Sequence, residues 1–235
     1  MADIFDELTS DFRAEQTRRI AMRLAIPAAI LAVLAGAGVV GWQVWRGNQA
    51  QQAVATATAY AAAARDAGGL ATADAAPTPA RAAAAQAEFD RLAASAPPGY
   101  RTLARLRAAA LRASAGDLPG ALAGWDALAN DTEADPALRD LARLLAAQHG
   151  IDAGEPPVVE ARLQPLLQPG NPWRPLAQEV QALLAMRTGR TDDAKALFRT
   201  LSTDQATPPG VRSRAGALLI RLGDPPPPAS AGAGG

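Results

Sequence analysis

The 235-residue sequence contains no cysteine, one histidine and few aromatic residues. Without cysteine it can form no disulfide, no thiolate zinc site and no thiol nucleophile. Aromatic residues make up only 4% of the chain although 49% of it is hydrophobic, and alanine accounts for most of the difference. Alternating runs of β-branched or aromatic residues, which are typical of strands, are also missing. We expect an all-α protein, because alanine favours helix and lets helices approach one another closely.

Charge and motifs argue against several classes of function. The net charge is zero, with 23 basic and 23 acidic residues, so we expect no nucleic-acid partner. Phosphate-binding glycine loops, serine nucleophile elbows and zinc-ligand spacings are missing. His149 stands beside Gly150 at the end of a helical pattern, where a histidine caps carbonyls or lies in solvent.

Asp131, Glu133 and Asp135 form an acidic cluster that lacks the glycine and the terminal glutamate of a calcium loop. A solvated turn accounts for it better than a cation site. We therefore expect no enzymatic activity, no cofactor, no metal and no small-molecule substrate.

One segment, Leu24 to Trp45, is free of charge and mostly apolar. As a helix its 22 residues would reach about 33 Å, enough to cross a hydrocarbon core of about 30 Å. We predict a single transmembrane helix over residues 24–45. Trp42, Trp45 and Arg46 are then expected at the outer membrane interface, where tryptophan is enriched.

The arginines around this segment predict its orientation. Four precede it and one follows closely: Arg13, Arg18, Arg19 and Arg23, then Arg46. By the positive-inside rule, residues 1–23 form a cytoplasmic segment and the rest of the chain lies outside.

Two alternatives to an anchor stay open. Ala35, Gly36 and Ala37 form a small-residue pattern that a signal peptidase could cleave. Against cleavage, the apolar run is longer than that of a typical signal peptide and the leader is rich in acid. A buried core helix is the second alternative, although no other part of the chain is apolar enough to surround it.

Beyond the segment, glycine and proline divide the chain into helices. Residues 46–79 are expected to form an extended helical stalk and a linker, and residues 80–222 a domain of paired antiparallel helices. Residues 223–235, rich in Pro, Gly and Ala, are expected to be a disordered tail. The predicted helices of the domain are 80–95, 100–115, 118–129, 136–150, 156–167, 172–187, 191–201 and 208–222.

Two of the predicted helix pairs share one pattern. A glycine is followed by a small residue five positions later and by an aromatic residue four positions after that: Gly116, Ala121 and Trp125, then Gly189, Ala194 and Phe198. The glycine would end the first helix, the small residue would let the second helix cross closely, and the aromatic ring would fill the remaining gap. This spacing resembles the second half of a tetratricopeptide repeat. Ala109 and Ala182 stand seven residues before the glycines, where that repeat has another small residue.

Between these pairs, residues 135–168 have the length of a repeat but a poor pattern. Gly154 is followed by Val159 and Leu163 where a small residue and an aromatic residue are expected. We predict a degenerate repeat here and an α-solenoid overall; an irregular set of helical hairpins is the alternative. Tyr100 and Trp173 are candidate partner-binding residues, although core packing would also account for large side chains in a fold with so few aromatics.

In their order along the chain, these features resemble the YfgM-like tetratricopeptide repeat proteins, ancillary subunits of the bacterial SecYEG translocon. The resemblance covers nearly the whole chain outside the proline-rich tail. The residues that carry it are the acidic and arginine-rich leader through Arg19; Gly41, Trp42 to Trp45 and Arg46; Tyr100, Arg101, Leu103 and Ala104; Gly116, Asp117 and Ala121; Asp140, Leu141 and Ala142; Pro172, Trp173, Arg174, Ala177 and Glu179; and Thr207, Pro208, Arg212, Arg214 and Ala215.

The resemblance implies a single-pass protein of the bacterial inner membrane, in contact with membrane lipid, with a periplasmic helical domain. It implies SecYEG and a PpiD-like periplasmic chaperone as partners, and a role in passing newly translocated proteins to periplasmic folding factors. It implies no catalytic residues. A signal-cleaved, soluble periplasmic helical-repeat binding protein of unrelated role remains the alternative.

Overall fold

The computed structural model describes residues 38–39, 42–68 and 77–225. The chain divides into two compact units, Met1–Ala55 and Thr56–Gly235, and each is described by itself. The predictions for residues 1–23, for most of the span at 24–45 and for most of the tail at 223–235 lie outside the described residues.

In the first unit, residues 42–55 are helical and exposed. Among the described residues no helix is both long enough and apolar enough to cross a membrane. The predicted span begins at residue 24, and its first fourteen residues are not among those described. The transmembrane helix therefore stays a prediction.

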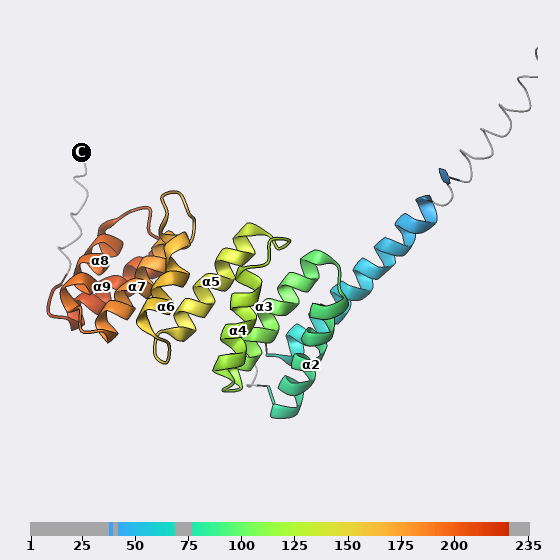
Figure 1. Ribbon diagram of the computed structural model, residues 1–235, viewed down its shortest axis with the longest axis horizontal. Coiled ribbons are helices and arrows are strands. Elements are labelled where there is room, and N and C mark those ends of the chain that lie inside the picture. The colour runs from blue at the N-terminus through green and yellow to red at the C-terminus, as the bar shows by residue number, and fades with distance from the viewer. Residues whose placement is uncertain (1–37, 40–41, 69–76, 226–235) are drawn as a thin grey trace, which may run out of the picture. The chain divides into compact units, whose positions relative to one another are not determined.

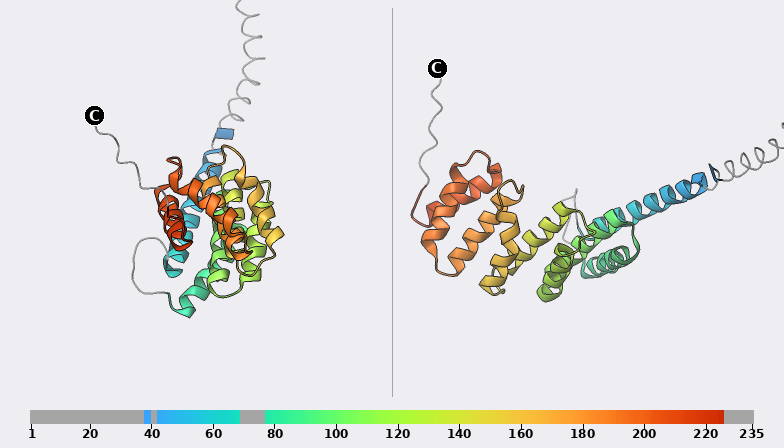
Figure 2. Two further views of the ribbon diagram at one scale, coloured as in Figure 1. Left: turned by 90° about the vertical axis from the view of Figure 1, so that its left-hand side faces the viewer. Right: turned by 45° about the horizontal axis from the view of Figure 1, so that its top comes forward.

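The second unit is helical, and its described residues contain no strand. Residues 56–66 are helical and precede the labelled helices. These are α2 (Pro79–Ser95), α3 (Pro98–Ser114), α4 (Leu118–Ala129), α5 (Pro136–Gly150), α6 (Pro156–Leu163), the 3₁₀-helix η1 (Gln164–Leu167), α7 (Arg174–Arg187), α8 (Thr191–Thr203) and α9 (Pro209–Arg221). From α2 to α9, helices that are neighbours in the chain are also neighbours in space, as Figure 1 and the two further views in Figure 2 show. The all-helical prediction is thereby confirmed for this unit.

Local sequence accounts for most helix boundaries. Proline stands at the first or second position of every α-helix from α2 to α9 except α8. At these positions a backbone N–H has no partner within the helix, so the N–H that proline lacks is not missed. Asp117 and Asp135 each accept a hydrogen bond at the start of their helix, from the N–H groups of Gly120 and Ala137. Side chains of this type satisfy free N–H groups at helix N-termini.

Two of the differences between predicted and observed boundaries involve proline. Pro98 was expected to lie in the break between two helices, but it is the first residue of α3. The predicted helix over 156–167 is divided into α6 and η1. Pro165 has no N–H to donate, so a regular α-helical bond is missing where the helix tightens.

The buried core lies between successive helices. One cluster joins residues 56–66 to α2 and α3, and further clusters join α3 to α4 and α5, α5 to α6 and α7, and α7 to α8 and α9. Each pair thus shares its core with the first helix of the next pair, as in repeat proteins generally. Ala63 and Ala64 are buried in the first of these clusters. The region predicted as a stalk, residues 46–79, therefore includes residues that pack in the second unit.

Candidate functional site

The helices of the second unit form two layers. In addition to its neighbours in the chain, α3 contacts α5, α5 contacts α7, and α7 contacts α9. The first helices of successive pairs thus lie side by side, and we call α3, α5, α7 and α9 the inner helices. The second helices α4, α6 and α8 cover the other side of the core.

The residues of the predicted repeat pattern occupy equivalent places in two pairs. Gly116 and Gly189 follow α3 and α7 with φ of +88° and +77°, a conformation that glycine adopts without steric penalty. Ala121 and Ala194 are fully buried in the second helices. Trp125 and Phe198 are fully buried as well, in the clusters shared with α5 and α9 respectively.

The sequence did not indicate two contacts at and next to Trp125. The ring of His149 stacks on Trp125, with centroids 4.8 Å apart and planes inclined by 29°. His149 is exposed in the last turn of α5, as expected, and the sequence did not indicate that it stacks on Trp125. α4 also packs tightly on α3 at Gly124, where an added Cβ would lie 3.2 Å from the Cβ of Ala109.

The degenerate repeat forms a helix pair in spite of its poor pattern. Val159 and Leu163 are buried at the positions expected for a small residue and an aromatic residue. Gly154 has no positive φ, but its N–H donates to the carbonyl of Gly150 at 2.8 Å. A Cβ on Gly154 would lie 2.6 Å from that carbonyl oxygen, so close packing explains this glycine.

A cavity of about 600 Å³ is lined by α5, α7 and α9. We call it the inner groove. Its apolar lining consists of Leu144, Leu176, Val180, Leu183, Ala217 and Leu218, and its polar lining of Gln148, Glu179, Arg214 and Arg221. None of these residues was singled out as a site by the sequence, because they come from three helices whose adjacency depends on the fold.

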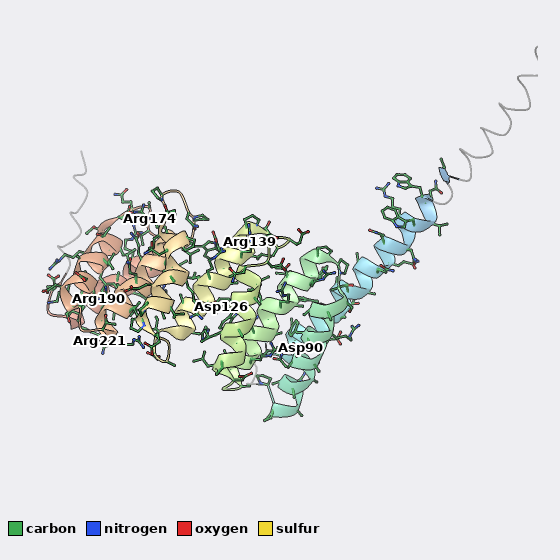
Figure 3. All side chains as sticks on the ribbon, viewed as in Figure 1. Asp90, Asp126, Arg139, Arg174, Arg190 and Arg221 are labelled. Carbon is green, nitrogen blue, oxygen red and sulfur yellow. The ribbon has the colours of Figure 1, made fainter. Side chains whose placement is uncertain are left out.

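A carboxylate and a guanidinium meet across this groove. Arg214 donates to Glu179 through Nε at 2.6 Å and through Nη2 at 2.7 Å. These hydrogen bonds raise the pKa of Arg214 above its usual value. Arg221, labelled in Figure 3, makes no ion pair with any residue that the structure describes.

The Glu179–Arg214 pair is one of several that join successive repeats. Asp126 accepts from Arg162 at 2.9 and 2.6 Å, and Glu160 accepts from Arg190 at 2.7 Å; Asp126 and Arg190 are labelled in Figure 3. The partners in these three pairs are 35, 36 and 30 residues apart, close to the 34 residues of one tetratricopeptide repeat. Opposite charges at this separation are the signal that could have revealed them in the sequence.

The candidate partner-binding residues lie outside the inner groove. Tyr100 is partly buried, with its ring centroid 5.7 Å from that of Tyr60. Trp173 is also partly buried and packs against the cluster of α5, α6 and α7. Their packing against core clusters supplies a structural role for both side chains.

The three residues expected at a membrane interface lie in the first unit. Trp42 and Trp45 are exposed. The guanidinium carbon of Arg46 lies 5.3 Å from the centroid of the Trp42 ring, within cation–π range.

The acidic cluster is a hydrogen-bonded turn. Asp131 accepts from the Arg105 guanidinium and, at 3.0 Å, from the N–H of Glu133. Both bonds stabilise the charged carboxylate and lower the pKa of Asp131, the arginine more strongly. Across the described part of the chain, no group of three or more His, Cys, Asp or Glu residues is placed to hold a metal ion.

Comparison with known proteins agrees with this architecture. Residues 25–210 match a family described as a tetratricopeptide repeat-like domain. Neither a curated protein nor a solved structure matches the chain. The match covers more than half of the sequence and includes the helices that line most of the inner groove. This chain belongs to the tetratricopeptide repeat-like domain family, whose fold serves protein–protein interaction.

Proposed function

We propose that this chain is a membrane-anchored scaffold whose inner groove binds a segment of a partner protein. The observation that carries the binding role is the groove itself, because three successive inner helices line it. Its apolar floor can bury side chains of a bound segment, and the polar groups at its wall can orient that segment.

The chemistry of the groove favours binding over catalysis. Glu179 is its only carboxylate, and both of its oxygens accept hydrogen bonds from Arg214. A carboxylate whose two oxygens are both engaged by a guanidinium is poorly placed to take a proton from a substrate. We therefore propose that the protein has no enzymatic activity.

The charge of the groove points to an acidic segment in the partner. Arg214 and Arg221 are seven residues apart on α9, so they lie on one face about 10 Å apart along the helix axis. Arg214 uses two of its five N–H donors for Glu179 and keeps others free. A segment with apolar side chains and an acidic edge would complement both features.

The location is proposed from the sequence. The charge-free segment 24–45 and the arginines before it support an inner-membrane anchor with residues 1–23 in the cytoplasm and the repeat domain in the periplasm. The family match begins at residue 25, so the matched region includes the proposed span.

The finer proposal concerns the partners. The order of motifs from the leader to Ala215 supports a role beside the SecYEG channel, together with a PpiD-like periplasmic chaperone. In this role the groove would hold acidic, partly apolar segments of newly translocated proteins or of the chaperone. The span would contact the channel, and its modest hydrophobicity suits a helix that packs against protein as well as lipid.

Site-specific photo-crosslinking in membranes tests these proposals. A crosslinking amino acid at Leu31 of the span should capture a SecYEG subunit, and one at Leu183 of the groove should capture a PpiD-like chaperone or a translocating chain. Ala196, exposed on α8 and outside the groove, is the matched control and should capture neither.

The translocon role would be contradicted if Leu31 captured no SecYEG subunit and Leu183 captured neither a PpiD-like chaperone nor a translocating chain. The proposal of a protein-binding scaffold would not be affected. A blot of the C-terminally tagged chain tests the anchor separately. A soluble species shortened by about 37 residues would contradict the anchor and favour signal cleavage.

A further inference from the structure

The C-terminal end of α9 has the same backbone geometry as the ends of α3 and α7. Each helix is followed by a glycine with positive φ: Gly116 at +88°, Gly189 at +77° and Gly223 at +71°. After each glycine, an N–H donates to the carbonyl five residues earlier: Asp117 to Arg112 at 2.9 Å, Arg190 to Ala185 at 2.8 Å, and Asp224 to Leu219 at 2.9 Å. This is the Schellman arrangement. In its backbone, α9 thus ends in the same way as α3 and α7, which are each the first helix of a pair.

The side chains of α9 continue the equivalence. The position seven residues before the glycine is occupied by Ala109 in α3, Ala182 in α7 and Gly216 in α9. The position three residues before it is occupied by Ala113, Met186 and Ile220 in the same order. In α3 and α7 these positions are covered. Ala109 and Ala182 are fully buried, and Ala113 and Met186 pack against clusters to which α4 and α8 contribute.

In α9 the equivalent positions are uncovered. Ile220 is 63% exposed, and Gly216 is only partly buried. We call Gly216 and Ile220 the open face of α9. The described residues contain no helix after α9 that packs on this face.

The sequence that follows α9 does not repeat the pattern of α4 and α8. Five and nine positions after the glycine, α4 carries Ala121 and Trp125, and α8 carries Ala194 and Phe198. After Gly223 the corresponding positions are Pro228 and Gly232. Four consecutive prolines begin at residue 225, and each disfavours helical conformation in the residue before it and removes an N–H donor.

We propose that the open face of α9 docks an amphipathic helix of a partner protein, antiparallel to α9, which carries a small residue and an aromatic residue four positions later. The small residue would allow close approach to Gly216, and the aromatic ring would cover Ile220. This chemistry follows from α4 and α8, which cover the equivalent faces of α3 and α7. The inference depends on the repeat geometry and is independent of the membrane anchor, the inner groove and the translocon role.

A second copy of the chain fits this face less well. Its own helices with the required pattern are α4 and α8, and Ala121, Trp125, Ala194 and Phe198 are fully buried in its core. To dock on α9 of another copy, either helix would have to leave its own array. A helix from a different protein has no such requirement.

A binding assay with full-length protein in detergent tests the proposal. The probe is a fluorescein-labelled peptide with the sequence of residues 190–203, which includes α8, and binding is measured by fluorescence anisotropy. We expect saturable binding that Ile220→Glu weakens by about tenfold or more, because burial of an isoleucine side chain contributes at least that much. A peptide with Phe198→Ala should weaken binding by a similar factor. Ile220 is mostly exposed, so its variant should fold normally.

Two further variants make the outcome decisive. Val158→Glu replaces an exposed apolar residue of α6, outside the open face, and should leave binding of the peptide unchanged. In a chain whose residues from 224 onward are replaced by the sequence 190–203, the grafted helix should occupy the open face and abolish binding.

No binding of the probe, or binding that neither Ile220→Glu nor the graft reduces, would overturn the proposal. Sedimentation of the protein without peptide measures its oligomeric state and tests whether a second copy occupies the open face. A dimer of the full-length chain that Ile220→Glu dissociates would identify a second copy as the occupant, and would also overturn it.

Discussion

Arg214 and Glu179 join α9 to α7 by a bidentate ion pair with unequal burial. The two hydrogen bonds measure 2.6 and 2.7 Å, and the Arg214 side chain is 56% exposed whereas that of Glu179 is 10% exposed. Water can solvate the arginine when the pair is broken, but it reaches the carboxylate poorly. The two halves of the pair therefore contribute differently to stability.

Arg214→Ala should destabilise the protein more than Glu179→Gln does. Loss of the arginine leaves a nearly buried carboxylate without its partner, at about 1–2 kcal/mol after allowance for the exposure of Arg214. Glutamine keeps the shape and an acceptor, so its effect should stay below about 1 kcal/mol. Urea unfolding of the full chain, followed by circular dichroism, measures both. Equal effects, or the reverse order, would contradict the asymmetry.

Gly189→Ala should destabilise the turn between α7 and α8 by about 1–2 kcal/mol, because a Cβ is strained at its positive φ. Gly99→Ala is the matched control. Gly99 lies in the first turn of α3 without a positive φ, and an added Cβ meets nothing within 4 Å. The control should therefore be neutral or slightly stabilising in the same unfolding experiment. A neutral Gly189→Ala would show that the turn tolerates another conformation.

Asp131→Asn should flatten the dependence of stability on pH in the acid range. Arg105 lowers the pKa of Asp131 in the folded state, so below about pH 4 the unfolded chain binds more protons at this position than the folded chain. The stabilisation is complete above the ordinary pKa of aspartate and is lost as the pH falls through the lowered one. Thermal unfolding across this range measures the slope. Arg105→Ala, which removes the largest cause of the lowered pKa, should flatten the slope in the same direction.

Brominated lipids should quench the fluorescence of Trp42 and Trp45 if these residues lie at the membrane interface. Trp125 is fully buried in the second unit, so it should not be quenched. Variants that keep a single tryptophan, reconstituted in vesicles, separate the signals. Quenching of Trp125 to the same degree as Trp42 would contradict the proposed placement of the interface.

Most helix boundaries could be predicted because they depend on neighbouring residues. Proline opens α5 and α6 where the sequence indicates, and the glycines at 116 and 189 end α3 and α7. The spacing of Ala121 and Trp125 from Gly116 also predicted the packed face of α4. These features follow from backbone sterics and helix periodicity, which act over one or two turns.

The inner groove and the ion pairs could not be predicted from neighbouring residues in the sequence. Glu179 and Arg214 stand 35 residues apart, and nothing in their neighbours in the sequence distinguishes them from solvated charges. The contact of Gly124 with Ala109 and the stacking of His149 on Trp125 likewise depend on how two helices cross. Such contacts are set by packing over the whole array.

Alanine content, the placement of proline and glycine, and one repeated motif were enough to establish an all-helical repeat protein, because local conformational preference dictates each helix. Which helices line the groove, which arginine faces which carboxylate and which face of α9 stays uncovered followed from the stacking of the pairs. Ile220 illustrates the difference. Its position in the helix repeats that of Ala113 and Met186, but its exposure depends on whether a second helix packs against it.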